Sequence, residues 1–256
     1  MSPCNIKHMS RFLMLTSREN DSLAMSERSA IRVYTGLADR ELAWIRLESD
    51  PFPKINLSQW DGIILCGSRF DVGAPQSSKS LKQQEIESNL YRLLYNILDH
   101  DFPFMGICYG LGLLTTMLGG KMTEHFGEEI GAPILTLTSE GLREPLLEGV
   151  PPRFQAYVGH HEAVYELPRT MTSLVRGDSA PVQMVRVKHN VFATQFHPEL
   201  DLGGIQHRID FFADAGYYPP EERAAVERRV LDVDTIPAHS ILFNFVKRYG
   251  SGPQIA

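Results

Sequence analysis

The stretch Pro103–Gly110, which reads PFMGICYG, decides the fold of this 256-residue chain. It begins with a short apolar run that is typical of a buried strand. The segment Gly110–Leu118 that follows reads as a helix, closed by two glycines. Between strand and helix, Gly106 and Gly110 flank Cys108 in the pattern small, any, nucleophile, any, small. We therefore predict a sharp turn that exposes the Cys108 thiol above the edge of a sheet.

The predicted turn gives Cys108 a reactive setting. Glycines on either side are needed because larger side chains would collide in so tight a turn. The positive end of the following helix favours the thiolate, the reactive form of cysteine. The backbone N–H of Tyr109 would point to where an oxyanion forms. A buried structural cysteine is the alternative for so short a motif, but the strand-to-helix context favours a nucleophile.

Outward from this turn, apolar strands alternate with amphipathic helices. The pattern predicts strands over 11–16, 43–47, 61–68, 102–107, 134–138, 154–158, 173–176, 183–187 and 191–195, and helices over 21–37, 80–99, 110–118, from Pro219-Pro220 onward and over 238–249. A hairpin turn is expected over 187–191. Strands that alternate with helices form a parallel sheet covered on both faces. We expect an α/β three-layer sandwich with a central, mostly parallel sheet and extra C-terminal helices.

Composition limits the class of protein. With 43% hydrophobic and 22% charged residues the chain is ordinary for a globular protein. We expect a flexible leader over 1–10 and a single domain over 11–250, with a helical C-terminal extension at about 201–250. Net charge is -6 and no basic block occurs, so we expect no nucleic-acid partner.

The three cysteines are too few for a disulfide framework, which favours a reducing compartment. The N-terminus also lacks an apolar run long enough for a signal peptide or a membrane span. We therefore expect a cytoplasmic protein without a membrane partner.

A thiol nucleophile needs a base, and the base needs an orienting group. His197 follows a strongly apolar strand, at the end of the sheet where α/β sites collect their residues. Pro198 stiffens the turn, and Glu199 lies two residues on, within reach of the imidazole. We predict that Cys108, His197 and Glu199 form a catalytic set, although a lone histidine at a strand end is more often structural.

Two other segments have weaker signals. His160 and His161 are adjacent and precede Glu162, yet neighbouring strand residues point to opposite faces, so we expect no metal site and favour a substrate-pocket or structural role. Gly67 and Ser68 end a buried strand. A glycine there lets backbone N–H groups approach a ligand closely, and beside Cys108 it becomes a candidate second oxyanion donor.

Three blocks together resemble the class I, triad-type glutamine amidotransferases. In the order of that family they are Asp61–Ser68, Pro103–Gly110 and Gln195–Glu199. Gly119-Gly120, residues 134–138 and Gly159–Glu162 also fall where the family has matching elements. The resemblance spans about residues 11–200. It implies the flavodoxin-like fold of that family.

The resemblance also implies a mechanism. Cys108, His197 and Glu199 would be the triad, with an oxyanion hole from the backbone of Gly67 and Tyr109. Glutamine would be hydrolysed through a cysteine thioester, and the ammonia released would pass to an acceptor. No metal or organic cofactor is implied.

Two positions depart from the family pattern near the glutamine pocket. Gly112 replaces a frequent Gln or His, and Gly159 replaces a frequent Ser. The predicted substrate-binding and oxyanion residues are Gly67, Ser68, Tyr109, Gly112, Gly159 and His160.

The chain resembles stand-alone members related to the amidotransferase domain of GMP synthase, which implies a synthetase acting in trans. A free-standing γ-glutamyl peptidase or hydrolase is the alternative, because the two small residues could admit a larger leaving group. A third hypothesis is a non-catalytic binding protein. The presence of all three residues, Cys108, His197 and Glu199, argues against it.

Overall fold

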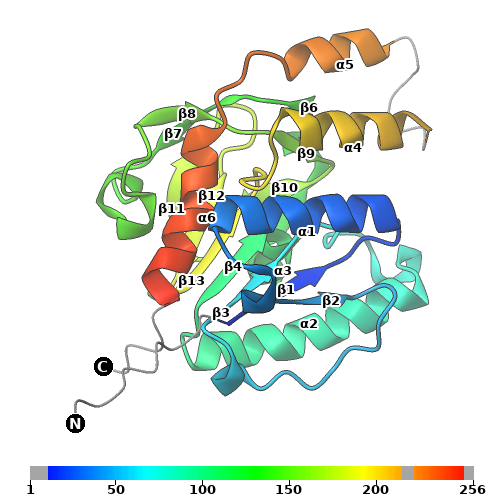
Figure 1. The fold of residues 1–256 in the computed structure, drawn as a ribbon, viewed down its shortest axis with the longest axis vertical. Coiled ribbons are helices and arrows are strands. Elements are labelled where there is room, and N and C mark those ends of the chain that lie inside the picture. Colours follow the sequence, from blue (N-terminus) through cyan, green and yellow to red (C-terminus); the bar gives the residue numbers. More distant parts are fainter. Residues whose placement is uncertain (1–10, 215–221, 251–256) are drawn as a thin grey trace.

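The computed structural model describes residues 11–214 and 222–250. Its central feature is a nine-stranded sheet (Figure 1). In sheet order the strands are β2 (Leu42–Arg46), β1 (Phe12–Thr16), β3 (Gly62–Leu65), β4 (Phe104–Ile107), β13 (Val191–Thr194), β12 (Met184–Val187), β11 (Met171–Arg176), β7 (Ile134–Leu137) and β8 (Arg153–Gln155).

The sheet is mostly parallel, as predicted. The run from β2 to β13 pairs in parallel. The run from β13 to β8 pairs antiparallel. Within this sheet, β12 and β7 therefore run against the direction that the other strands share. The parallel part carries the carboxyl ends of β3, β4 and β13 to one edge, which is where ligands bind in open α/β sheets.

Helices cover both faces of the sheet. They are α1 (Asp21–Thr35), α2 (Leu81–Asp99), α3 (Tyr109–Met117), α4 (Leu202–Asp214), α5 (Arg223–Arg229) and α6 (Ile236–Tyr249). One apolar cluster joins Phe12 and Met14 to α1 and α6, and a second joins Leu13 and Leu15 to α2 and α3. Alternate residues of one strand thus serve opposite layers, which is why β1 is apolar throughout.

Local sequence signals set the ends of these helices. Asn20 caps α1 by accepting from the Leu23 backbone N–H, and Gly36 ends it at φ 73°. Ser80 caps α2 in the same way through the Gln83 N–H. Such caps satisfy backbone donors that the first helical turn leaves unpaired. Among the described residues, no helix is both long and apolar enough to cross a membrane.

The C-terminal helices continue the fold beside two small sheets. These sheets pair β5 (Lys121–Thr123) with β10 (Ala163–Glu166), and β6 (Glu128–Gly131) with β9 (Val158–His160). A third apolar cluster joins Tyr157 to α4 and α5, and Figure 1 shows both helices at the end of the molecule that holds β6 and β9. The Tyr157 hydroxyl donates to the Val230 carbonyl at 2.8 Å.

Most predicted elements are confirmed, and two departures have a physical reason. The predicted strand over 154–158 is wrong: the chain leaves β8 at Gln155 and pairs again from Val158 with β6. The short strands β5, β6 and β10 were not predicted because three or four residues give too little periodicity. The expected leader over 1–10 and the helix start at Pro219-Pro220 lie outside the described residues.

The packing of α6 against β1 gives a stability test. Phe245 is fully buried and meets Phe12 edge to face at 6.0 Å between ring centroids. Phe245→Ala should lower the free energy of unfolding by about 3–5 kcal/mol, as expected for an emptied aromatic site. Phe243, on the same helix but 51% exposed, is the control: Phe243→Ala should change it by less than about 0.5 kcal/mol. Urea titration followed by circular dichroism measures both, and equal losses would contradict the packing described.

Candidate active site

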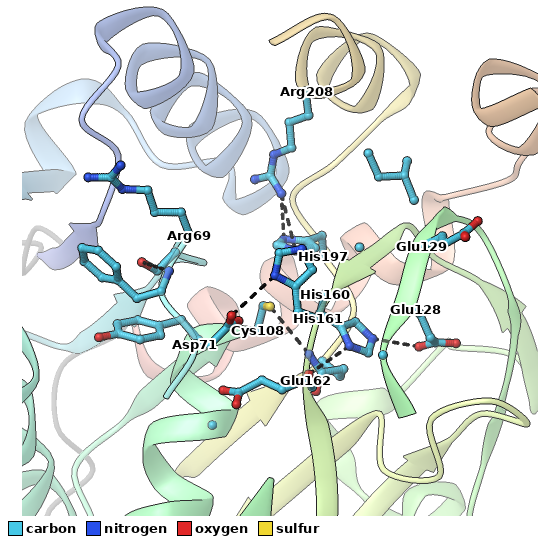
Figure 2. A pocket seen from close by; sticks show the side chains of 18 of the residues that line it. Arg69, Asp71, Cys108, Glu128, Glu129, His160, His161, Glu162, His197 and Arg208 are labelled. Atoms are coloured by element: carbon cyan, nitrogen blue, oxygen red, sulfur yellow. Dashed lines mark hydrogen bonds and ion pairs between the residues drawn. The ribbon is translucent and has the colours of Figure 1, made fainter. Parts of the chain in front are cut away.

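A cavity of about 540 Å³ opens at the carboxyl ends of the parallel strands (Figure 2). Seven of the predicted site residues line it: Ser68, Cys108, Tyr109, Gly112, Gly159, His160 and His197. Glu199 is fully buried behind His197, and Gly67 lies against both His197 and Cys108. The structure therefore brings the predicted set together at one edge of the sheet, while the roles of its members remain predictions.

The turn at Cys108 has the expected strained geometry. Cys108 has φ 52° and ψ -84°, a backbone conformation that residues with a side chain rarely adopt. Its backbone N–H donates to the Thr194 carbonyl at 2.7 Å, which ties the turn to the end of β13. A Cβ at Gly106 would lie 2.9 Å from the Gly110 Cα. Glycine at 106 is thus required by the close approach of strand and helix.

Gly67 marks the point where nucleophile and base converge. A Cβ placed on Gly67 would lie 3.7 Å from the Cys108 Cβ and 3.0 Å from the His197 Cε1. Both side chains therefore come within van der Waals reach of one point. A backbone that approaches this closely needs glycine, and its proximity to Cys108 is consistent with the predicted role of Gly67 as an oxyanion donor.

His197 is held by groups from two sides. Its Nδ1–H donates to Glu199 Oε1 at 2.8 Å, which leaves Nε2 unprotonated as the proton acceptor. The backbone N–H of His197 donates to the Tyr157 carbonyl at 2.9 Å. The orientation of the ring is therefore fixed by its own main chain and by the carboxylate behind it, as a general base requires.

Three charged residues next to the triad were not predicted from the sequence. Arg208 of α4 donates to Glu199 Oε1 at 2.9 Å and to Glu27 Oε1 at 3.2 Å. Arg18, just after β1, donates through Nε to the same Glu27 oxygen at 3.2 Å. Nothing in the local sequence signals this group, because Arg208 lies 181 residues from Glu27 and no motif links Arg18 to Glu27. Only the fold brings them together.

The electrostatics differ from the expectation of a stabilised thiolate. Burial raises the pKa of Cys108 to about 12, although the charges of Arg18 and Arg208 act to lower it. Burial also lowers the pKa of His197. Desolvation of the thiolate thus outweighs the two arginines. These pKa shifts favour a neutral thiol beside a neutral imidazole, whereas the strand-to-helix turn led us to expect a stabilised thiolate.

Glu199 stays ionised next to this neutral pair. Burial alone would raise its pKa, but the hydrogen bond from His197 and the charge of Arg208 lower it below the usual value for a glutamate. A carboxylate that accepts from His197 fixes the tautomer and stabilises the imidazolium that forms during proton transfer.

Gln195 is a further residue at the nucleophile. It is 2% exposed, and its Nε2 donates to Cys108 Sγ at 3.6 Å. Gln195 belongs to the sequence block that contains His197 and Glu199. The sequence did not predict its contact with the Cys108 thiol. The contact restrains the thiol on the side of β13.

The two glycines that depart from the family pattern do not simply leave empty space. A Cβ at Gly112 would lie 3.2 Å from the Val72 Cγ2, and one at Gly159 would lie 3.3 Å from the Ile130 Cγ1. Val72 and Ile130 therefore occupy the space beside these positions. The wall of the cavity is therefore apolar at Gly112 and Gly159, the positions that were predicted to bind substrate.

The paired histidines serve different partners. His160 is buried and its Nε2 lies 2.9 Å from Glu128 Oε2, whereas His161 is exposed and pairs with Asp71 at 3.5 Å. Among the described residues, no group of three potential ligands is placed to hold a metal ion. Glu162 accepts from the backbone N–H groups of Val72 and Gly73, and burial raises its pKa to about 7. This carboxylate ties the loop after β3 to the wall of the cavity.

An α/β fold with a cysteine on a strand-to-helix elbow, faced by a buried histidine and carboxylate, defines an enzyme of the amidohydrolase and amidotransferase class. The sequence model of the family "Glutamine amidotransferase class-I" matches residues 34–213. This chain belongs to that family.

Related sequences and structures agree with this assignment. GMP synthase [glutamine-hydrolyzing] of Helicobacter pylori is 30% identical over 139 residues, which is 54% of this chain and 24% of that protein. The same enzyme of Thermomicrobium roseum is 30% identical over 62% of this chain and 27% of its own length. The chain thus spans about a quarter of these relatives. A glutamine amidotransferase of Thermotoga maritima has the same fold, with a TM-score of 0.73 at 19% identity over 96% of this chain and all of the other.

The geometry of the turn at Cys108 predicts that a substitution at Gly106 lowers the stability of the protein and that the same substitution at Gly110 does not. Gly106→Ala should lower the free energy of unfolding by about 1–3 kcal/mol, because its Cβ would meet the main chain of Gly110. Gly110→Ala is the control, since its Cβ would come no closer than 3.7 Å to the surrounding residues and would lie in a helix. The expectation that both glycines are needed to avoid a collision of side chains is therefore wrong for Gly110. Chemical denaturation and the alkylation rate of Cys108 measure the effect. A larger loss for Gly110→Ala would contradict the elbow geometry.

Proposed function

We propose that this protein hydrolyses the side-chain amide of glutamine, or of a γ-glutamyl compound, through a thioester on Cys108. The observation that carries the proposal is the elbow-mounted Cys108 facing a His197 that is oriented by Glu199. A nucleophile, a base and an orienting group in one cavity are the parts that covalent acyl transfer needs. We further propose that it acts in the cytoplasm, where a thiol nucleophile stays reduced.

The chemistry proceeds in two halves. His197 Nε2 takes the thiol proton while Cys108 Sγ attacks the amide carbon, and backbone N–H groups at Gly67 and Tyr109 bind the resulting oxyanion. Collapse of the tetrahedral intermediate breaks the C–N bond, and His197 returns its proton to the departing ammonia. Water then attacks the thioester with His197 as base. The carboxylic acid leaves, and the Cys108 thiol is restored.

The neutral resting pair suits this sequence of steps. A neutral imidazole is ready to accept the thiol proton, and the imidazolium that forms lies beside the ionised Glu199. Charge therefore separates only when substrate is present to be attacked. The elbow and the histidine supply proton transfer, so this route requires no metal or organic cofactor.

We propose that the released ammonia passes to an acceptor enzyme in trans. The relatives described above are named GMP synthase [glutamine-hydrolyzing], and this chain matches about a quarter of their length. A synthetase that consumes ammonia is the kind of partner that this similarity supports. This partner remains a proposal.

A free-standing γ-glutamyl hydrolase is the second candidate, favoured by the size of the cavity. Its volume of about 540 Å³ lies within the ~300–1,000 Å³ typical of sites for drug-sized ligands. Its walls include Phe70, Met122 and Val226 in addition to the catalytic set. Such a site has room and apolar surface for a leaving group larger than ammonia.

One substrate panel separates these candidates. Purified protein is offered glutamine and a series of γ-glutamyl peptides, and ammonia, free amine and glutamate are quantified. Ammonia release from glutamine supports the amidotransferase role, and preference for peptides supports the hydrolase. Cys108→Ser should lower turnover by roughly 10³-fold or more, because the nucleophile is lost.

Cys66→Ala is the matched control, because Cys66 is buried in the core and takes no part in the proposed chemistry. It should retain activity. An acyl adduct on the Cys108 peptide after acid quench would identify the thioester. If wild type and Cys108→Ser were equally inert on every substrate, with and without cell extract, the proposed function would be wrong.

A further inference from the structure

The groups behind the triad form one buried ionic network. It contains two cations, Arg18 and Arg208, and two anions, Glu27 and Glu199. All four side chains are at most 10% exposed. Glu27 is the shared centre, because it accepts from both arginines and from the Thr16 hydroxyl. Removing one member of a buried network leaves its partners unbalanced, so each charge influences the others.

Arg208 occupies the decisive position in this network. Its Nη2 donates to Glu199 and Glu27, while its Nη1 lies 3.2 Å from Nδ1 and 3.4 Å from Nε2 of His197 (Figure 2). Nδ1 already directs its proton to Glu199. Because the Nδ1 proton is directed to Glu199, Nε2 is the ring nitrogen that can accept from Nη1, at 3.4 Å. This contact requires an unprotonated Nε2, so it stabilises the neutral form of the imidazole.

We propose that Arg208, anchored by Glu27, is a positioning residue of the triad: it fixes the carboxylate of Glu199 and holds the His197 imidazole in its neutral, proton-accepting form. The planar guanidinium suits this task, since one edge bridges two carboxylates while the other end contacts the ring. A fixed positive charge beside an imidazole disfavours a second positive charge on it. The inference rests on the proposed function only for the assay of turnover.

Other charged and titratable groups face this site from every side. Arg18 follows β1, Glu27 lies on α1, and Cys66 and Cys108 follow β3 and β4. Arg208 comes from α4, and the Nδ1–H of His239 on α6 donates to the Pro198 carbonyl at 2.7 Å. Burial is the largest influence on the pKa of His197 and lowers it. The charge of Glu199 raises this pKa, whereas the charges of Arg208 and Arg18 lower it. Removal of Arg208 therefore has a defined sign.

The first test removes the charge while keeping the apolar stem. In Arg208→Met, both His197 and Cys108 lose a neighbouring cation, so both pKa values rise. The two limbs of the pH profile of kcat/KM should move to higher pH, by about one unit as expected for the loss of a close charge. Arg208→Lys keeps the charge and loses the bridging geometry, so its limbs should stay near those of wild type while kcat falls.

The second test removes the anchor and predicts the opposite sign. Glu27→Gln retains the shape but leaves two arginines facing the site with one carboxylate fewer. Both limbs should then move to lower pH. If Arg208 and Glu27 had only a structural role, both variants would have a lower midpoint of thermal unfolding, and the two limbs of the pH profile of kcat/KM would stay where they are in wild type. Opposite displacements report charge rather than loss of packing.

A readout independent of turnover accompanies these profiles. The rate of alkylation of Cys108 by iodoacetamide is followed against pH by peptide mass spectrometry. Its midpoint should rise in Arg208→Met and fall in Glu27→Gln. Arg223→Met is the matched control, because Arg223 of α5 pairs with Asp210 of α4 on the exposed surface. Its midpoint and its pH profile should equal those of wild type.

The outcomes decide the inference separately from the proposed function. If alkylation midpoints move as stated while no γ-glutamyl substrate is turned over, the proposed function fails and the role of Arg208 stands. If turnover is normal but neither midpoint nor limb moves in folded Arg208→Met protein, the role of Arg208 is overturned. Should Arg208→Met fail to fold, the other two variants decide the question. Glu27→Gln should move the pH profile to lower pH, and Arg208→Lys should leave the profile in place while kcat falls.

Discussion

The contact between Gly106 and Gly110 is the constraint on which the site depends. Their main chains approach so closely that a Cβ at Gly106 would lie 2.9 Å from the Gly110 Cα. This approach lets the chain reverse from β4 into α3 with Cys108 at φ 52°, held by the carbonyl of Thr194. A strained residue persists only where its surroundings over-determine it. Here the parallel strands on both sides of β4 supply that support, and strand β13 also delivers His197 to the same edge.

Burial and charge oppose one another at this edge. Removal from water favours neutral forms of Cys108 and His197, whereas the arginines favour a thiolate and disfavour an imidazolium. Both arginines and burial thus favour a neutral His197, whereas at Cys108 burial outweighs the arginines. In the proposed mechanism the proton leaves sulfur only when substrate is attacked, and Glu199 stabilises the imidazolium that forms. Activation would then fall to the base and to the oxyanion donors rather than to the helix dipole that the sequence suggested.

The sequence predicts the parts of this site that are local and leaves out those that are not. Cys108, with glycines two residues away on each side, and His197, with Glu199 two residues on, are short patterns whose geometry is set by one turn each. Arg208 and Glu27 lie 181 residues apart, and no periodicity or motif links them. The fold class followed from strand and helix alternation, whereas β5 and β6 were too short to leave a signal. The split between β8 and β9 arises from a partner strand that sequence reasoning had not placed.

The hydrolytic half and the substrate half of the cavity are built by different parts of the chain. The triad stands on the ends of β4 and β13, the rigid centre of the sheet, whereas Val72 and Ile130 come from the loop after β3 and from the small sheet that contains β6. These two side chains fill the space beside Gly112 and Gly159, where the family pattern carries larger polar residues. A substrate that enters this cavity contacts an apolar wall at the positions that were predicted to bind free glutamine. Under the proposed function, the choice between glutamine and a larger γ-glutamyl amide would therefore be made by these peripheral segments, while the chemistry at Cys108 would be the same for both.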